Sequence, residues 1–372
     1  MLNQLVALSN RYGQNPELVL AGGGNTSLKD ANTLYIKGSG TSLADIDADG
    51  FVKMDRALLA QMRTKEYPAL EAEREAAVLA DLMSARQKGE ENKRPSVETL
   101  LHDLFEYRFV VHTHPALVNG LTCGQHGAEE TARLFGSRAV WIPLVKPGYV
   151  LAMEVKREMD AFKMKTGRAA DLILLQNHGI FVAGDTEEAV DSIYKEVLTA
   201  LETCLTARPD FSPVAVDAVR VEALKAETEA VFGGNAVFVS NEEISKLTAG
   251  PDAFYPVSSV FTPDHIVYCK HTPLFVSFAE DLEEQRAILR REMEAFAGRH
   301  GFLPQVIAVE KLGVVTAGKS EKTARAAADL FLDGVKIAVY SRSFGGPLFL
   351  SREMIAFISN WEVEAYRQKQ TV

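Results

Sequence analysis

Three histidines at the ends of apolar runs are the residues best suited to chemistry in this sequence. His112 and His114 are two residues apart, so on a strand their side chains point to the same face. His178 follows another apolar run, between Asn177 and Gly179. A single buried histidine would be explained by core packing, but three neutral imidazoles with an open fourth position are the usual ligands of catalytic zinc. We predict a site for zinc, or another divalent transition metal, at His112, His114 and His178.

Glu98 is the candidate acid/base. Residues 95–98 are expected to open a helix with Ser96 as its N-cap. Glu98 and His102 then share one helix face at positions i and i+4, with His102 in a supporting role. The helix leads directly into the strand of the histidines, so the carboxylate can ligate the metal or move a substrate proton. The alternative is an ordinary first-turn glutamate, stabilised by the helix dipole by about 0.3–1 kcal/mol.

Two glycine- and serine-rich loops can bind an anion. Residues 22–27 and 38–41 combine glycines with small polar side chains, and backbone N–H groups in such loops form anion-binding nests. Side-chain donors and positive charge are close by, at Asn25, Ser39, Thr41, Ser96, Lys29 and Lys37. Each loop alone is weak evidence, because glycine turns are common. A dinucleotide fingerprint is absent, so a dinucleotide cofactor has no support.

A phosphate-loop pattern occurs once, from Gly313 to Ser320. It follows an apolar run and precedes a predicted helix, as a nucleotide-binding loop does. Only about fifty residues remain after it, and the next expected strand, 335–340, does not end in an acidic metal ligand. Nucleotide hydrolysis is therefore disfavoured, while local anion binding and a plain solvated helix face both stay open.

Composition narrows the class of protein. The chain has 372 residues, 47% of them hydrophobic, which favours two domains over one. The net charge of −10 argues against a nucleic-acid partner or an anionic membrane surface. Three widely separated cysteines give no disulfide framework, and neither a signal peptide nor a membrane-spanning run is recognisable. We expect a cytoplasmic protein.

The pattern of apolar residues predicts mixed helices and strands in both halves. We expect helices at 2–13, 67–87, 151–167, 186–207, 281–298, 321–333 and 351–369. We expect strands at 138–145, 171–176, 236–239, 265–269, 273–277, 305–309 and 335–340. The turn-rich segment 209–213 is the expected boundary between a catalytic domain, 1–210, and a C-terminal domain, 214–372, whose role the sequence leaves open.

Five ordered motifs resemble the class II aldolase/adducin family over residues 1 to about 205. They are the segments 23–27, 37–40, 95–98, 112–115 and 177–179. Three stretches, at 22–27, 37–40 and 262–265, are most similar to the aldolase part of bifunctional rhamnulose-1-phosphate aldolase/dehydrogenase proteins, and we expect no dehydrogenase domain here.

The resemblance implies an α/β fold: a three-layer α/β/α class II aldolase-like domain, followed here by a second, smaller α/β domain. It implies retro-aldol cleavage of a ketose 1-phosphate to dihydroxyacetone phosphate and an aldehyde, through a metal-stabilised enediolate, with Glu98 as acid/base. It also implies a homotetramer and a small-molecule sugar phosphate as substrate. The implied phosphate cradle comprises Gly24, Asn25, Ser27, Ser39, Gly40 and Ser96.

Val97 departs from the family pattern, because many phosphate-binding members have a second serine there. This keeps open a metal-dependent epimerase, or a lyase or decarboxylase acting on another hydroxy-carbonyl compound. A glutamate rather than an aspartate at position 98 favours the aldolase over the epimerases. A non-catalytic, adducin-like binding protein is the third alternative, which the retained histidines and Glu98 argue against.

Overall fold

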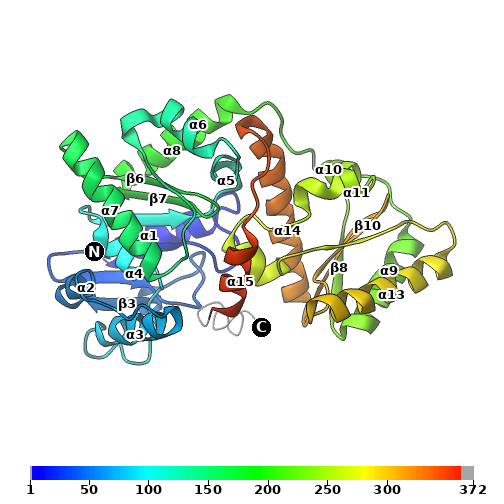
Figure 1. Cartoon of the computed structure of the whole chain (residues 1–372), viewed down its shortest axis with the longest axis horizontal. Coiled ribbons are helices and arrows are strands. Elements are labelled where there is room, and N and C mark those ends of the chain that lie inside the picture. The colour runs from blue at the N-terminus through cyan, green and yellow to red at the C-terminus, as the bar shows by residue number, and fades with distance from the viewer. Residues whose placement is uncertain (1, 362–372) are drawn as a thin grey trace. The chain divides into compact units, whose positions relative to one another are not determined.

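The computed structural model describes residues 2–361 and divides the chain into two compact units (Figure 1). The first unit comprises Met1–Thr122 and His126–Cys204. The second comprises Cys123–Gln125 and Leu205–Val372. Each unit contains its own sheet and helices, so each is described by itself.

The first unit is built on a mixed sheet that, within the described residues, has seven strands in the order β3-β2-β1-β4-β7-β6-β5. These are β1 Asn25–Lys29, β2 Thr33–Lys37, β3 Phe51–Asp55, β4 Phe109–Thr113, β5 Val140–Ile142, β6 Leu172–Leu175 and β7 Gly179–Gly184. The neighbours β5 and β6 pair in parallel, and the other neighbours pair antiparallel. The centre of the sheet, β1-β4-β7, is the part that carries the predicted histidines.

Helices cover both faces of this sheet. They are α1 Leu2–Gly13, α2 Arg56–Met62, α3 Glu71–Ser84, α4 Thr99–Leu104, α5 Ala116–Thr122, α6 Gly127–Phe135, α7 Tyr149–Thr166 and α8 Glu187–Cys204. On one face Val110 and Phe181 join a core with side chains of α4 and α7. On the other face Thr26 bonds to Ser9 of α1, and Thr113 bonds to Tyr194 of α8. Alternate residues of one strand thus face different helices, which gives the predicted α/β/α layers.

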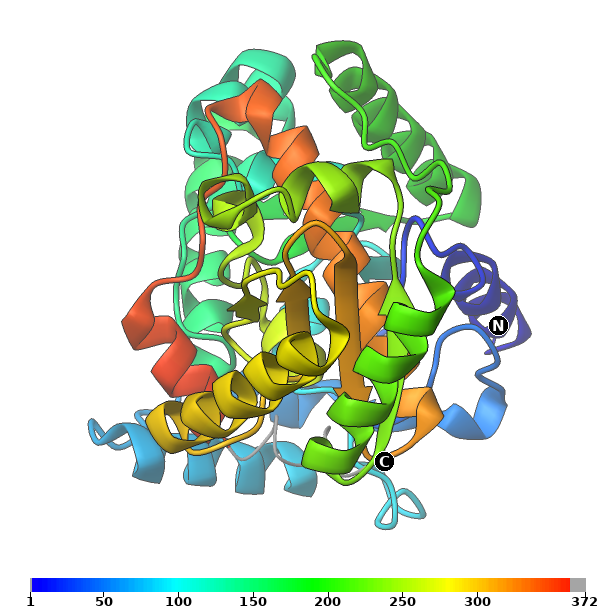
Figure 2. The ribbon, with the colours of Figure 1, turned by 90° about the vertical axis from the view of Figure 1, so that its right-hand side faces the viewer.

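The second unit is a smaller α/β structure with a four-stranded sheet, counted within residues 205–361, in the order β8-β11-β10-β9. The strands are β8 Asn235–Val239, β9 Leu274–Val276, β10 Val306–Val309 and β11 Gly313–Gly318. Helices α9 Ala218–Phe232 and α13 Leu282–His300 lie side by side across one face (Figure 2). The long helix α14 Glu321–Ser341 packs on β11 and β8, where Thr316 of β11 donates to Ala324 of α14. Shorter helices α10 Glu242–Leu247, α11 Pro251–Phe254, α12 Pro263–Cys269 and α15 Arg352–Asn360 complete it.

Most predicted elements are present with shorter bounds, but two predicted strands are wrong. Residues 265–269 belong to α12, and residues 335–340 are the last turns of α14. Thr262 and His265 form a capping box and Pro263 occupies the first turn, so this segment begins as a helix despite its β-branched residues. In the C-terminal part of α14, Val335, Ile337 and Val339 are β-branched residues at alternate positions, a local pattern that is typical of a strand. The predicted helix 351–369 is present from Arg352 to Asn360, and 362–369 lie outside the described residues.

The phosphate-loop pattern does not form a phosphate-binding loop. Gly313–Gly318 is strand β11, hydrogen-bonded between β8 and β10. Ser320 then caps α14 by accepting from the Thr323 N–H. A Cβ at Gly318 would lie 2.4 Å from the Ala324 nitrogen, so this glycine serves close packing of strand against helix. None of the helices described between residues 2 and 361 is both long enough and apolar enough to span a bilayer.

Candidate metal centre

The three predicted histidines converge at one end of the central strands. His112 lies in β4, His114 follows it directly, and His178 lies in the turn between β6 and β7. Their ligand nitrogens all lie within 4.8 Å of one another. The Nε2 atoms of His112 and His114 are 2.9 Å apart. Three imidazoles aimed at one point form a group that can hold a metal ion.

The surroundings of His112 fix its orientation and its tautomer. Its Nδ1–H donates to the Ile180 carbonyl at 2.9 Å, which leaves the Nε2 lone pair directed at the cluster. Its ring stacks on Phe181, with centroids 3.9 Å apart and planes 11° apart. Burial is the main cause that lowers the pKa of His112 well below its ordinary value. The imidazole is therefore neutral, the form that ligates a metal.

Two glycines allow the backbone to approach the histidines closely. A Cβ at Gly179 would lie 2.4 Å from the Thr113 carbonyl oxygen and 2.7 Å from Cδ2 of His114. Gly24 has a φ of +65°, and a Cβ there would lie 2.8 Å from the His112 carbonyl oxygen. Substitution at either position would displace the strand ends that hold the metal-binding group.

Glu98 lies against the histidine cluster from the side of α4. Its Oε1 is 3.4 Å from Nε2 of His112 and 3.5 Å from Nε2 of His178. Its Oε2 accepts from Nδ2 of Asn25 at 2.6 Å. In the part of the chain that the structure describes, the buried Oε1 has no hydrogen-bond donor. A carboxylate oxygen in this position is available to a cation or to a proton in transit.

Burial opposes ionisation of Glu98, but its surroundings outweigh burial. The neighbouring imidazoles, His112 first and then His178, and the hydrogen bond from Asn25 lower the pKa of the Glu98 carboxyl to about 2. A metal ion held by the histidines would add positive charge and act in the same direction. Glu98 is thus a carboxylate at neutral pH and suited to accept a proton.

The helix carrying Glu98 starts later than predicted. Ser96 is not its N-cap: α4 begins at Thr99, and Glu98 is the N-cap residue, with no side-chain capping bond. Ser96 instead accepts from the Glu98 N–H through its hydroxyl, at 3.2 Å. The His102 N–H still donates to the Glu98 carbonyl at 3.0 Å, so the predicted i, i+4 relation holds.

The predicted phosphate donors Asn25 and Ser27 are engaged inside the protein. Asn25 gives its Nδ2 to Glu98 and, at 3.3 Å, to Ser96. Its Oδ1 bonds to His102 Nε2, and Ser27 Oγ bonds to His102 Nδ1 at 2.7 Å. The sequence alone did not reveal these partners, since His102 lies 75 residues or more from both. The fully buried Ser27 is directed at His102.

The remaining predicted cradle residues lie in loops that the backbone ties together. The Ser39 N–H donates to the Arg94 carbonyl at 2.7 Å, and the Ser96 N–H donates to the Lys37 carbonyl at 3.1 Å. Lys37 donates through Nζ to the carbonyls of Gly22 and Gly24, each at 3.0 Å, and so braces the glycine loop. Gly40 is exposed, and Ser39 and Ser96 are half-buried, which leaves the backbone of Gly40 and the two serine hydroxyls within reach of a ligand.

A metal fits this donor set. The three nitrogens converge, His112 is neutral with its ligating nitrogen fixed, and a buried carboxylate oxygen without a donor faces the same point. His112 and Glu98 are buried while His114 and His178 are half-buried, so a cation could reach the group and share its lone pairs.

The comparison with known families places residues 3–204 in the class II aldolase and adducin N-terminal domain family, and the chain belongs to this family. Membership supports an aldolase-type lyase. A curated relative, the "Uncharacterized oxidoreductase YuxG" of Bacillus subtilis (strain 168), is 24% identical over 416 residues. The match covers 98% of this chain but only 58% of that relative, so the chain spans little more than half of its length.

The similar solved structures cover about half of this chain. One is the N-terminal class II aldolase domain of a conserved Thermoplasma acidophilum protein, at 27% identity and a TM-score of 0.46, covering 54% of this chain and 92% of that one. Another is the L-fuculose-1-phosphate aldolase of Thermus thermophilus, at 18% identity and a TM-score of 0.36, with coverages of 54% and 92%.

Proposed function

We propose that this protein is a metal-dependent aldolase that cleaves a ketose 1-phosphate to dihydroxyacetone phosphate and an aldehyde. The observation that carries the proposal is the Glu98 carboxylate 3.4–3.5 Å from two of three converging imidazoles. A lysine Schiff base is the other route to such cleavage, but Lys37 and Lys29 already donate to backbone carbonyls.

His112, His114 and His178 would hold the metal, with zinc our first choice. When bound, the metal would supply a Lewis acid that stabilises negative charge developing on the substrate carbonyl. Glu98 would move the proton at the carbon next to that carbonyl: it delivers this proton to the carbon after the carbon–carbon bond breaks, and in the reverse direction it accepts it through Oε1 while Asn25 holds Oε2. Ser39, Gly40 and Ser96, with the backbone near Gly24, would receive the phosphate.

A substrate without phosphate is the second candidate, acted on by an epimerase, lyase or decarboxylase using the same metal site. Two observations favour it. Val97 replaces a serine donor, and the amide of Asn25 and the hydroxyl of Ser27 bond within the protein. The sugar-phosphate interpretation therefore depends on fewer side-chain donors than the motif implied. We further propose a cytoplasmic homotetramer with no nucleic-acid partner.

The test combines metal content with cleavage of a panel of ketose 1-phosphates and their unphosphorylated forms. We expect about one divalent metal per chain, loss of activity on chelation and recovery with zinc. Glu98→Gln should keep the metal and lose about 10²–10⁴-fold in kcat. His126→Gln, an exposed histidine outside the cluster, is the matched control and should keep both. The proposal would be refuted if the protein took up no metal or if Glu98→Gln kept full activity. If the protein turned over only unphosphorylated compounds, the second candidate function would be selected.

A further inference from the structure

Strand β1 presents polar residues where a core strand is expected to be apolar. All five of its residues are buried, and Asn25, Ser27 and Lys29 alternate, so they share one face. Buried polar groups need partners, and all three find theirs in α4 and the residue that follows it. Asn25 and Ser27 bond to the His102 ring, while Lys29 Nζ donates to the carbonyls of His102 and Phe105. His102 is therefore the hub of a buried network beneath the metal centre.

The direction of each hydrogen bond follows from the chemistry of the partners. The Asn25 Oδ1 can only accept, so the proton of His102 is on Nε2. Nδ1 then accepts, and the Ser27 hydroxyl donates to it. Burial lowers the pKa of His102 to about 3. The ring is neutral with one proton; the acceptor Oδ1 of Asn25 places that proton on Nε2, and the Ser27 hydroxyl, which can donate or accept, satisfies Nδ1.

The orientation of the Asn25 carboxamide is set by Glu98, whose carboxylate can only accept, and it is supported by His102. With Oδ1 held by His102, Nδ2 points at Glu98 Oε2, 2.6 Å away, and at Ser96 Oγ, 3.3 Å away. The reversed amide would place oxygen against the Glu98 carboxylate and N–H₂ against the His102 N–H. The contact between two oxygens would be repulsive, so Glu98 sets the orientation of the amide, and the Nε2–H of His102 then holds Oδ1 in place.

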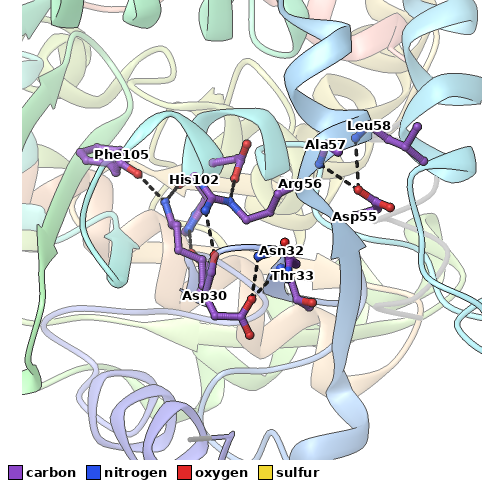
Figure 3. A network of polar contacts seen from close by, with 12 residues as sticks. Asp30, Asn32, Thr33, Asp55, Arg56, Ala57, Leu58, His102 and Phe105 are labelled. Carbon is purple, nitrogen blue, oxygen red and sulfur yellow. Dashed lines mark hydrogen bonds and ion pairs between the residues drawn. The ribbon is translucent and has the colours of Figure 1, made fainter.

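The helix that carries His102 is itself anchored. Asp103 bonds to Arg56 at 2.6 Å and pairs with Arg63. Arg56 also donates to the Asp30 carbonyl at 2.8 Å (Figure 3). Lys29 binds the carbonyls at the other end of α4 from Glu98. The backbone of α4 is thus fixed from both sides, so His102 can be changed without freeing the helix.

We propose that His102 is a positioning residue: through the Asn25 carboxamide it fixes the Glu98 carboxylate beside the three histidines. The inference deepens the proposed function and rests on it for the catalytic consequence. The contact itself, His102 to Asn25 to Glu98, stands on the geometry alone.

The structure offers a matched pair of substitutions. In His102→Gln the amide nitrogen falls near the place of Nε2 and can donate to Asn25. In His102→Asn it falls near Nδ1, beside Ser27, and cannot. The first readout is solvent exchange of the Asn25 side-chain N–H₂ by NMR on protein labelled with ¹⁵N-asparagine, with the signal assigned by its loss in Asn25→Asp. We expect protection in wild type and His102→Gln, and exchange about 10-fold faster or more in His102→Asn.

The second readout is exchange of the ketone α-proton of dihydroxyacetone phosphate with deuterated solvent, which needs Glu98 but no aldehyde. We expect His102→Asn to lose about 10²-fold in the rate constant, with KM and metal content unchanged, and His102→Gln to recover most of it. Equal protection and equal rates in the two variants would overturn the inference. Parallel loss of metal, KM and rate would overturn it too, because His102 would then merely support the fold. In a third outcome, the Asn25 N–H₂ is protected as predicted, but the wild-type protein does not exchange the α-proton of dihydroxyacetone phosphate. That outcome would refute the proposed function and leave the contact from His102 through Asn25 to Glu98 established.

Discussion

Replacing His102 by glutamine should make the first unit more resistant to acid. His102 is fully buried and its pKa is lowered to about 3, by burial first, so the native protein excludes a proton that the unfolded chain binds near pH 6.5. Between these two values stability falls as pH falls, because the unfolded state binds more protons. Above pH 6.5 the effect disappears. Glutamine keeps the hydrogen bond to Asn25 and removes the titration.

The magnitude follows from the two pKa values. Lowering the pH from 7 to 5 destabilises the native state by about 2 kcal/mol through His102 alone. This figure is insensitive to the native pKa, provided that the value lies below about 4. Glu98 titrates near pH 2, outside this window. The buried His112 adds its own acid sensitivity equally in both proteins, so the difference between them isolates His102.

The assay is denaturant unfolding at pH 7 and pH 5, followed by tryptophan fluorescence. Trp141 in β5 belongs to the first unit, so a Trp361→Phe background makes the signal specific to that unit. A chelator is present throughout, since metal binding is itself pH-dependent. The exposed His126→Gln is the matched control and should keep the wild-type loss. An equal loss of stability in His102→Gln and wild type would show that His102 is protonated in the native state, and would refute the network as drawn.

Three further results are expected. Gly179→Ala should cost about 1–3 kcal/mol of stability and reduce metal uptake measured by elemental analysis, because its Cβ would meet Thr113 and His114. The control Gly298→Ala, with open space around the added Cβ, should have neither effect. An unchanged metal content in Gly179→Ala would contradict the close approach. Val97→Ser should lower KM for a phosphorylated substrate relative to its unphosphorylated form, and an unchanged ratio would remove position 97 from the phosphate cradle. Asp103→Ala should destabilise the protein by about 3–5 kcal/mol in thermal unfolding, because Arg56 and Arg63 lose a buried partner. A change below about 1 kcal/mol would show that solvent replaces the Asp103 carboxylate as the partner of the two arginines.

The convergence of the three histidines was predictable because its signal is local, while metal binding there stays a prediction. His112 and His114 needed only the two-residue alternation of a strand, and His178 needed only its place after an apolar run. The α/β class and the family followed from ordered motifs, and the family match confirmed them. The metal itself, the substrate and the oligomeric state stay predictions, because they depend on molecules that the sequence does not contain.

The errors arose where local and tertiary signals conflict. Residues 335–340 resemble a strand in sequence because Val335, Ile337 and Val339 are β-branched and alternate, although they belong to the end of the long helix α14. Residues 265–269 resemble a strand because β-branched residues outweighed the cap at Thr262 and Pro263, a signal that was present and could have been used. The Gly313–Ser320 pattern matched a phosphate loop letter by letter, yet its residues form a paired strand. A motif of this kind identifies a site only when its structural context agrees.

The role of Asn25 shows how far a family motif can be carried. The motif assigns Asn25 and Ser27 to a phosphate cradle, but their side chains already have partners in His102, Ser96 and Glu98. A strand position that is buried, polar and two residues from another such position needs a partner across the fold. That partner sits on a helix about 75 residues later, which no local pattern can indicate. The alternating polar residues Asn25, Ser27 and Lys29 make β1 a poor core strand, because burying them costs free energy. The same residues allow β1 to support α4 and to hold the Glu98 carboxylate in one place.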